Sequence, residues 1–309
     1  MSNIVITGCA GFIGSHAADL FLEKGFSVFG IDCLTYASCF ENMNNAMSYD
    51  NFLFAQEDIC NTDSILDICK KNDVEYILNF AAESHVDNSI NNAYPFLRSN
   101  VQGVLSLLEV CRRSDTKIFQ ISTDEVYGSS STYSFLEKDK LDPRNPYSAS
   151  KAAAEHFVTS YSNTHGIGYK MVRMSNNFGP RQHNEKLLPT AIRALASCNR
   201  VPIYGDGKNI RDWFYVKDCV KMIHDVFYRG KENEIYNLTY NNEMNNLFLI
   251  TKLCNIMKKN PQDSIEFVDD RPGHDFRYSI SNEKIKGIGI GEPTNFYKAL
   301  EETIDSIVF

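Results

Sequence analysis

Residues 3–14 read Asn-Ile-Val-Ile-Thr-Gly-Cys-Ala-Gly-Phe-Ile-Gly, and they set the fold class. The first five residues form a short apolar run typical of a buried strand, and a helical pattern then extends to Lys24. Between them, Gly8, Gly11 and Gly14 allow backbone N–H groups at a helix N-terminus to approach a pyrophosphate. The pattern predicts a dinucleotide-binding α/β fold, and the alternative is a tight turn that holds no ligand.

A second apolar run, residues 26–32, ends at Asp32, about 20 residues beyond the glycine turn. A carboxylate at this position accepts hydrogen bonds from both ribose hydroxyls of NAD. It would repel the 2′-phosphate of NADP, and the following Cys33 and Leu34 supply no cation to offset the repulsion. The sequence therefore favours NAD.

Strand-like runs alternate with helix-like stretches through the first part of the chain, which predicts a Rossmann-type, doubly wound parallel sheet. The expected strands are 3–7, 26–32, 52–56, 76–81, 117–122 and 169–174. Beyond Asn176 short strand signals (201–204, 234–238, 264–268) mix with helical patterns (187–197, 216–227, 247–258). We expect an NAD-binding domain at 1–175, with 211–240 returning to it, and a smaller substrate-binding lobe at 176–309.

Tyr147 and Lys151 are spaced i, i+4, so they lie on one face of a helix. A phenol ionises near 10 in water, and a neighbouring ammonium or nicotinamide cation makes it a plausible base near neutral pH. Such a pair is common by chance on solvated helices. Its occurrence together with the dinucleotide-binding motif described above favours a catalytic role.

Residues 122–128, Ser-Thr-Asp-Glu-Val-Tyr-Gly, follow a predicted strand and place two adjacent carboxylates at its carboxyl end. Proximity and burial raise the pKa of one carboxyl, so Asp124 can act as an acid while Glu125 acts as a base. The alternative is that both residues only cap or solvate a loop. The neighbouring Thr123 and Tyr147 favour a catalytic role.

These motifs resemble the nucleotide-sugar 4,6-dehydratases, which act on dTDP-glucose or UDP-glucose, within the extended short-chain dehydrogenase/reductase superfamily. The similarity covers nearly the whole chain and includes residues 31–36, 81–87, 175–180, 205–213 and 270–275. The Asp124-Glu125 pair separates this family from the related 4-epimerases, decarboxylases and GDP-mannose dehydratases. One departure is Cys9, where the family commonly has glycine; the residue is either an inert buried thiol or a mildly oxidant-sensitive one.

The resemblance implies a lyase mechanism with tightly bound NAD that is regenerated in each cycle. Tyr147 takes the proton of the sugar 4-hydroxyl while C4 gives hydride to NAD, and Thr123 and Lys151 assist. Glu125 then removes the C5 proton while Asp124 protonates the departing 6-hydroxyl. Hydride return to C6 gives a 4-keto-6-deoxy sugar, a step toward deoxysugars such as rhamnose.

The resemblance also implies which residues contact the ligands. The cofactor-binding residues are Gly8, Gly11, Phe12, Ile13, Gly14, Asp32, Asp58, Ile59, Ala81, Ala82, Tyr147 and Lys151. The substrate-binding residues are Ser84, His85, Thr123, Asn176, Lys186, Leu187, Tyr204, Arg211, Arg271 and His274. Arginine suits a diphosphate because its fork of donors binds two oxygens at once.

The composition excludes several other classes. A formal charge of −8 over 309 residues argues against general binding of nucleic acid or an anionic membrane surface. Nine scattered cysteines, no charged-then-apolar leader and no membrane-length apolar run predict a cytosolic enzyme, and the seven histidines form no metal-binding pattern. The resemblance implies a homodimer formed by helices at 100–112 and 147–162, although both could simply cover the sheet.

Other functions remain open at this point. A nucleotide-sugar 4-epimerase would stop after C4 oxidation and would not need Asp124 or Glu125. A decarboxylase would need a further cation for a glucuronate carboxylate. A dinucleotide sensor without enzyme activity would lack Thr123, Tyr147 or Lys151, and all three are present. Uracil and thymine differ by one methyl group, and no motif distinguishes UDP-glucose from dTDP-glucose.

Overall fold

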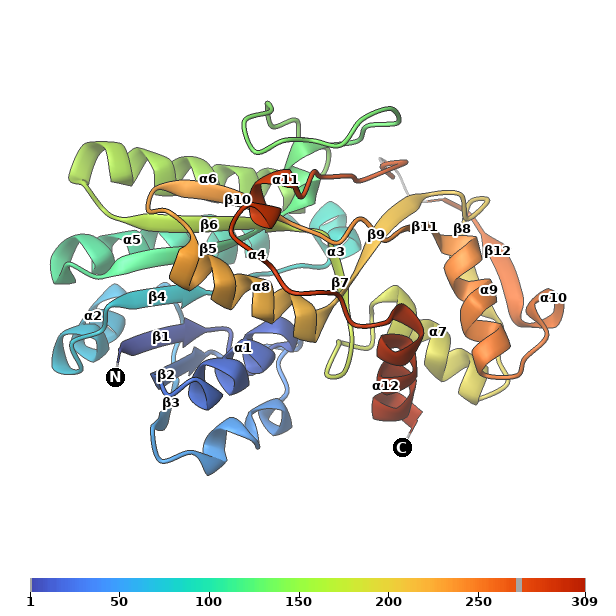
Figure 1. Ribbon diagram of the computed structural model, residues 1–309, viewed down its shortest axis with the longest axis horizontal. Coiled ribbons are helices and arrows are strands. Elements are labelled where there is room, and N and C mark those ends of the chain that lie inside the picture. The colour runs from blue at the N-terminus through green and yellow to red at the C-terminus, as the bar shows by residue number, and fades with distance from the viewer. Residues whose placement is uncertain (1, 271–273, 309) are drawn as a thin grey trace.

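Seven parallel strands form the main sheet of the protein (Figure 1). The computed structural model describes residues 2–270 and 274–308. The spatial order of the strands is β10 (Glu234–Leu238), β6 (Tyr169–Met174), β5 (Lys117–Thr123), β4 (Tyr76–Asn79), β1 (Asn3–Thr7), β2 (Ser27–Asp32) and β3 (Phe52–Gln56). The predicted Rossmann-type sheet is confirmed, and each predicted strand lies within two residues of the observed one.

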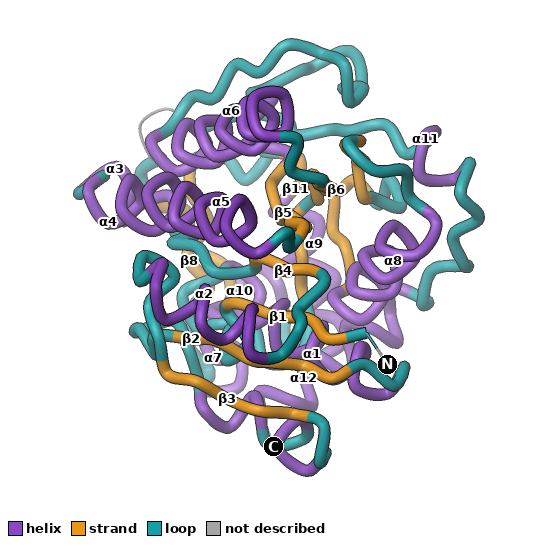
Figure 2. The backbone as a smooth tube through the Cα atoms, turned by 90° about the vertical axis from the view of Figure 1, so that its left-hand side faces the viewer, coloured by secondary structure: helices purple, strands orange, loops and turns teal. Residues whose placement is uncertain are grey.

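Helices cover both faces of this sheet (Figure 2). One face packs against α1 (Phe12–Glu23) and α8 (Val216–Arg229), in a core where Phe21 and Ile223 are fully buried. The opposite face packs against α2 (Thr62–Lys71), α5 (Gly103–Ser114) and α6 (Pro146–His165). Because both faces are covered, the central strands are buried and rich in apolar residues, with a few buried polar side chains such as Gln120 on β5.

Short helical segments fill the connections of this half of the chain. They are η1 (Phe40–Met43), η2 (Ala46–Ser48), α3 (Val86–Asn91), α4 (Tyr94–Phe96), the π-helical η3 (Leu97–Gln102) and η4 (Asp124–Tyr127). The last of these begins directly after β5, at the carboxyl end of the sheet, where ligands bind in doubly wound folds.

The second half of the chain builds a smaller lobe with its own core (Figure 1). It contains a three-stranded sheet, a two-stranded parallel sheet and four helices among the described residues. The strands are β7 (Asn176–Phe178), β9 (Ile210–Tyr215) and β11 (Glu243–Asn245), then β8 (Val201–Tyr204) and β12 (Ile265–Val268), and the helices are α7 (Leu187–Ala196), α9 (Asn246–Ile256), α10 (Pro261–Ser264) and α12 (Phe296–Val308). The short α11 (Glu283–Lys286) packs instead beside β10 of the main sheet. Buried side chains of α7, α9 and α12 meet in one apolar cluster that includes Ile192, Leu253 and Leu300.

Part of the second half of the chain returns from the smaller lobe to the main sheet. β9 pairs with β7 and β11 in the lobe, whereas α8 and β10, which follow it, pack on and extend the main sheet.

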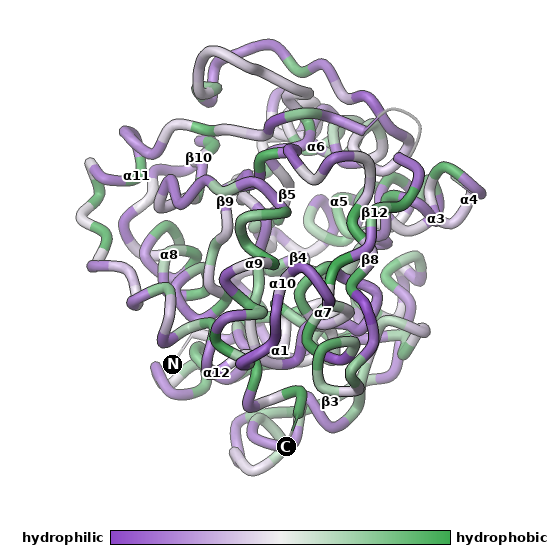
Figure 3. Tube along the Cα trace, turned by 90° about the vertical axis from the view of Figure 1, so that its right-hand side faces the viewer, coloured by the Kyte–Doolittle hydropathy of each residue, from purple (hydrophilic) through white to green (hydrophobic). Residues whose placement is uncertain are grey.

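Hydrophobic and hydrophilic residues alternate along the helices (Figure 3). Within residues 2–270 and 274–308, no helix is long and apolar enough to cross a membrane.

Candidate active site

The glycine turn packs too tightly for side chains. Gly8 has φ +69°, in the left-handed region, and a Cβ there would lie 2.8 Å from the backbone nitrogen of Ala81. A Cβ on Gly14 would lie 2.1 Å from the carbonyl oxygen of Gly8. The turn therefore brings the first strand, the N-terminus of α1 and the β4 loop together with bare backbone, as close approach to a pyrophosphate requires.

Asp32 ends β2 with its carboxylate fixed by three donors. Its Oδ2 accepts from the backbone nitrogen of Ala10 at 3.0 Å, and its Oδ1 accepts from Leu34 N and Ser38 Oγ, each at 2.8 Å. The side chain is buried, yet it lines the cavity beside the glycine turn. This is the position that selects ribose hydroxyls over a 2′-phosphate.

One cavity of about 630 Å³ extends from the glycine turn to β5. Every predicted cofactor residue lines it: Gly8, Gly11, Phe12, Ile13, Gly14, Asp32, Asp58, Ile59, Ala81, Ala82, Tyr147 and Lys151. Arg98 lines the same cavity, where its guanidinium pairs with Asp58 at 2.7 Å. The size is in the range of cofactor sites, and the bare glycine turn and fixed carboxylate fit NAD.

Tyr147 stands in the first turn of α6, and a capping box fixes the start of this helix. Asn145 accepts from the backbone nitrogen of Ser148 at 2.9 Å, and Ser148 Oγ accepts from Asn145 N at 3.2 Å. Burial and the negative charge of Glu125 raise the pKa of the Tyr147 phenol above its usual value, and a hydrogen bond with Thr123 opposes that rise.

Lys151 lies one turn further along α6, and its ammonium has a different contact from the one expected. Its Nζ donates to the carbonyl oxygen of Ile121 at 2.7 Å, in the interior of β5. Burial lowers the pKa of Lys151 to about 8, and the negative charge of Glu155 opposes that shift. The predicted stabilisation of phenolate by Lys151 is therefore offset in this structure by burial, which dominates the pKa of Tyr147.

The two carboxylates occupy the buried turn η4, which begins where β5 ends. Thr123 caps this turn: its Oγ1 accepts from Glu125 N at 3.3 Å and donates to Asp124 Oδ1 at 3.2 Å. Burial raises the pKa of the Asp124 carboxyl well above its usual value, and the charges of Glu125 and Asp212 add to the effect. These surroundings favour the protonated form of the Asp124 carboxyl, which is the form that an acid catalyst requires.

The second oxygen of Asp124 is buried, and no hydrogen-bond donor within the described residues reaches it. Glu125, in contrast, is held by neighbours: its Oε2 accepts from Asn145 Nδ2 at 3.2 Å and from the Tyr278 hydroxyl at 3.4 Å. A buried polar atom without a partner is costly unless a ligand or water completes it. The geometry therefore leaves Asp124 available to a substrate and orients Glu125.

Part of the predicted substrate site gathers at the edge of the cavity. Ser84 and Lys186 both line it, and the Lys186 ammonium donates to the Ser84 carbonyl at 2.9 Å. Leu187 begins α7 directly after Lys186. Asn176 lies on β7, where its Oδ1 is buried without a hydrogen-bond partner in the part of the chain that the structure describes.

Other predicted substrate residues lie beyond this cavity. His85 caps α3, where its Nδ1 accepts from Asn88 N at 3.3 Å. The exposed Tyr204 ends β8, and its ring centroid lies 6.4 Å from that of His274, whose Nδ1 is 2.7 Å from Asp270 Oδ1. Arg271 falls outside the described residues.

Arg211 is buried on β9 and is surrounded by protein acceptors. Its guanidinium donates to the carbonyl oxygens of Ile210 at 2.7 Å and Asp275 at 3.0 Å. The same guanidinium lies 4.2 Å from the centroid of the Tyr278 ring, a cation–π contact. Arg211 is therefore oriented by the protein itself, which the sequence did not indicate.

Two residues near the site were missed from the sequence. The Tyr278 hydroxyl donates to Asp275 Oδ2 at 2.8 Å and also reaches Glu125. Asn100, in the π-helical η3, exchanges hydrogen bonds of 2.9 Å with both backbone groups of Glu83 and donates to Ser150 Oγ. Asn100 lies within a helical sequence pattern and Tyr278 follows a polar turn. Nothing in the sequence distinguishes these two residues from others in such positions that have no part in a site.

Cys9 is the inert thiol of the two alternatives. It is fully buried, its Sγ contacts Met43 Sδ at 3.5 Å, and burial raises the pKa of the thiol above its usual value. Because thiolate is the reactive form, this environment protects Cys9 from oxidants.

The sequence matches a known protein family over nearly its full length. The family described as GDP-mannose 4,6 dehydratase aligns with residues 5–303. The chain belongs to the nucleotide-sugar 4,6-dehydratases. Like the other members of the extended short-chain dehydrogenase/reductase superfamily, this dehydratase has the Rossmann-type sheet described above.

Three relatives illustrate the range of this dehydratase family. A low-salt glycan biosynthesis protein of Haloferax volcanii is 43% identical, over 98% of this chain and 97% of its own length. A dTDP-glucose 4,6-dehydratase of Haemophilus influenzae is 36% identical, over 100% of this chain and 98% of its own. A trifunctional Arabidopsis thaliana enzyme with UDP-glucose 4,6-dehydratase activity is 35% identical over 98% of this chain, which spans only 46% of that enzyme's length.

Solved dehydratases and epimerases share this fold but differ in sequence identity to the chain. A dTDP-glucose 4,6-dehydratase of Streptomyces venezuelae, crystallised with NAD, superposes with a TM-score of 0.95 at 35% identity and covers 98% of this chain and 96% of its own. A UDP-glucose 4-epimerase of Thermotoga maritima has a TM-score of 0.91 at 26% identity, with 98% of both chains covered. The fold is common to both classes, but the sequence is closer to the dehydratases.

Proposed function

We propose that this dehydratase uses NAD to remove water from glucose carried on a nucleoside diphosphate, either dTDP or UDP. The observation that supports this most directly is the buried Asp124-Glu125 turn, which lies between the NAD-type cavity and the substrate lobe. The Asp124 carboxyl has a raised pKa and an oxygen without a partner among the described residues. Its product would be the 4-keto-6-deoxy sugar, a precursor of deoxysugars such as rhamnose.

The first step falls to residues at the ends of β5 and α6. Bound NAD supplies the acceptor for the C4 hydride and the donor that later returns it to C6. Tyr147 takes the proton of the 4-hydroxyl, and the Thr123 hydroxyl donates to the same oxygen. Lys151 lies one helical turn from Tyr147 and donates to the Ile121 carbonyl, and its positive charge would favour the ionised phenol against the effect of burial.

The second step uses the two carboxylates of η4. A ketone at C4 acidifies the C5 proton, which Glu125 removes from the orientation that Asn145 and Tyr278 give it. The protonated Asp124 donates to the departing 6-hydroxyl, and water leaves from C5 and C6. Glu125 then returns its proton to C5 as hydride reaches C6. Tyr147 releases to solvent the proton that it took from the 4-hydroxyl, and Asp124 takes one up from solvent to replace the proton given to the departing water, so that each group recovers its starting state.

For substrate binding we propose the residues suggested by the resemblance. Lys186, which lines the cavity, offers a cation to the diphosphate, and Asn176 would donate to it from its amide nitrogen. Arg211 would contact the same diphosphate, its guanidinium already oriented by carbonyl oxygens. Ser84, His85, Leu187, Tyr204, Arg271 and His274 complete the proposed substrate set.

Parallel incubation of the purified protein with UDP-glucose and dTDP-glucose tests the proposed function. We expect loss of one water, measured by mass, together with the alkaline absorbance of a 4-keto-6-deoxy sugar. The ratio of the two kcat/KM values identifies the preferred nucleotide, since one methyl group in an apolar pocket is worth about 1–3 kcal/mol. Formation of the galactose epimer without water loss would contradict the proposal and favour a 4-epimerase.

We further propose that the enzyme is a homodimer that pairs through the helical layer of α5 and α6. Helices α3 and α4 lie at one end of this layer (Figure 2), and the side chains of Ile90 on α3 and Leu97, directly after α4, are 40% and 55% exposed. Exposed apolar surface is typical of an interface. Sedimentation velocity at micromolar protein is expected to give twice the mass of the chain, and a monomeric mass would refute the dimer.

We propose the cytosol as its location. All nine cysteines are unpaired in the structure, which suits a reducing compartment.

A further inference from the structure

The loop that follows the catalytic turn is rich in serine, and its sequence alone gave it no function. We call residues 129–134, Ser-Ser-Ser-Thr-Tyr-Ser, the serine loop. It is joined to η4 by Gly128, whose φ is +77° and where a Cβ would lie 2.5 Å from the carbonyl oxygen of Asp142. Because this joint is tightly packed, the position of the serine loop constrains the turn that contains Asp124 and Glu125.

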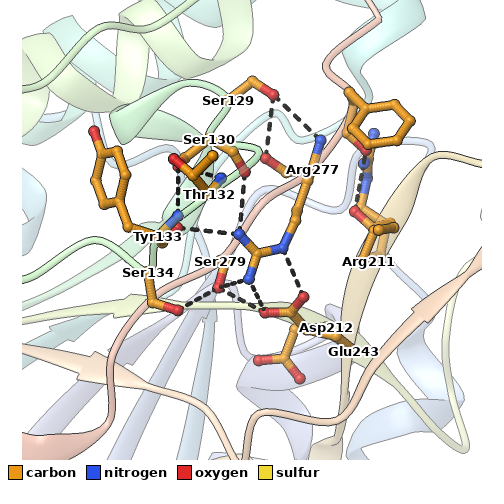
Figure 4. A network of polar contacts seen from close by, with 12 residues as sticks. Ser129, Ser130, Thr132, Tyr133, Ser134, Arg211, Asp212, Glu243, Arg277 and Ser279 are labelled. Atoms are coloured by element: carbon orange, nitrogen blue, oxygen red, sulfur yellow. Dashed lines mark hydrogen bonds and ion pairs between the residues drawn. The ribbon is translucent and has the colours of Figure 1, made fainter.

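Arg277, almost 150 residues later in the chain, ties this loop down (Figure 4). Its Nη1 donates to the carbonyl oxygens of Ser130 and Tyr133, each at 3.1 Å. Its own backbone joins the loop as well: its N–H donates to Ser129 Oγ, and its carbonyl accepts from Ser130 N, both at 3.2 Å. One arginine thus replaces water as the partner of several loop backbone groups.

The guanidinium is itself held by a two-pronged ion pair with Glu243 on β11. Nε and Nη2 of Arg277 lie 2.7 and 2.8 Å from the two carboxylate oxygens, in the fork geometry that distinguishes arginine from lysine. The side chains are only 16% and 25% exposed, so the pair is better shielded from solvent than a surface pair. Ser279 bridges the pair to Ser134, as Figure 4 shows.

The segment that carries Arg277 also touches the catalytic base. Tyr278 is the next residue, and its hydroxyl reaches Glu125 Oε2 at 3.4 Å and Asp275 at 2.8 Å. On the other side, Arg211 of β9 donates to the Asp275 carbonyl. Residues 275–279 therefore lie between the substrate lobe and the acid–base turn and contact both.

The helix that carries Tyr147 and Lys151 also has contacts of its own with the main sheet. Glu155, one turn after Lys151 on α6, accepts from Ser122 Oγ and forms a buried ion pair with Arg173 at 2.6 Å. The hydrogen bonds and ion pairs of Arg277 described above include none with α6. Disturbing Arg277 should therefore affect the carboxylates much more than the Tyr147–Lys151 pair.

We propose that Arg277, paired with Glu243, is a positioning residue for the elimination step. It fixes the serine loop and Tyr278 so that Asp124 and Glu125 reach C6 and C5 of a sugar held in the substrate lobe. The inference rests on the proposed dehydration. It assigns to the second half of the chain a specific part in the chemistry, distinct from contact with the substrate.

The test compares Arg277→Gln and Arg277→Lys with the parental protein in single-turnover mixing with the preferred nucleotide glucose. We expect reduced nicotinamide to form at close to the parental rate and then to decay roughly tenfold to a hundredfold more slowly in Arg277→Gln, because misplaced acid–base groups slow elimination. Arg277→Lys keeps the charge without the fork and should decay at an intermediate rate. Parental decay in both variants, or equal loss of formation and decay in both, would overturn the proposal.

A matched control and a second readout separate positioning from general damage. Arg229→Gln also removes an arginine that pairs with an aspartate and a backbone carbonyl, but on α8, and should behave as the parent. Hydrogen–deuterium exchange should rise in residues 129–134 of Arg277→Gln and remain unchanged in Arg229→Gln, and unchanged exchange in both would also overturn the proposal. If the parental protein itself removes no water, the proposed function fails; a working parent with unaffected Arg277 variants refutes only the role of Arg277.

Discussion

Replacing Asp124 by Asn is expected to lower dehydration by about 10²–10⁴-fold while leaving C4 oxidation nearly intact. The amide has nearly the same shape but cannot give up a proton to the departing 6-hydroxyl. Mixing this variant with substrate should therefore produce a lasting absorbance of reduced nicotinamide, where the parental enzyme shows only a transient one. Asp142→Asn is a suitable control, because Asp142 is an exposed carboxylate paired with Arg144 at 3.3 Å close to the same loop.

The pH dependence of turnover should report the same acid. Burial raises the pKa of the Asp124 carboxyl, so its proton is retained to higher pH than in an exposed aspartic acid and is lost as pH rises through the raised pKa. Elimination should therefore slow on the alkaline side. If Asp124→Asn turned over like the parent at every pH, another group would have to be the acid.

Replacing Tyr147 by Phe is expected to abolish the first step, with a loss of about 10²–10⁴-fold in C4 oxidation. The phenol is the proton acceptor in the proposed mechanism, and a phenylalanine ring in the same place of the cavity lining cannot take a proton. No reduced nicotinamide should appear on mixing with substrate, in contrast to Asp124→Asn. The pair of variants thus separates oxidation from elimination.

Tyr161→Phe provides the control for this experiment. Tyr161 lies on the same helix, and its hydroxyl donates to Glu109 at 2.8 Å, away from the cavity. It should retain full activity. Formation of reduced nicotinamide by Tyr147→Phe at the parental rate would remove the tyrosine from the mechanism and leave Thr123 or Lys151 to be tested as the acceptor.

The main sheet and the cofactor wall could be predicted because their signals are local. The signals are the apolar centre of the first strand, three glycines and an acidic residue at the end of the next strand. Each of them can be recognised within a short stretch of chain. Period and backbone requirements of this kind can be read directly from sequence. Every predicted cofactor residue accordingly lines one cavity.

The contacts that orient the catalytic groups could not be predicted, since their partners are distant in sequence. Lys151 shares α6 with Tyr147, but the acceptor of its ammonium, the carbonyl oxygen of Ile121 on β5, is 30 residues away in the sequence. The Tyr278–Glu125 contact joins residues 153 positions apart, and the links of Arg277 to the serine loop span a similar distance. Such pairs depend on how the lobe packs against the sheet, which no local pattern specifies.

The support that the second half of the chain gives to the active site also bears on how this fold can diverge. Tyr147 and Lys151 are held by β5, β6 and α6, whereas the serine loop, and Glu125 in part, receive support from residues 243–279. Substitutions in that later region can thus accumulate and retune elimination without disturbing hydride exchange. An ancestral protein of this fold that only oxidised its substrate could therefore gain or lose a dehydrating activity through changes in residues 243–279.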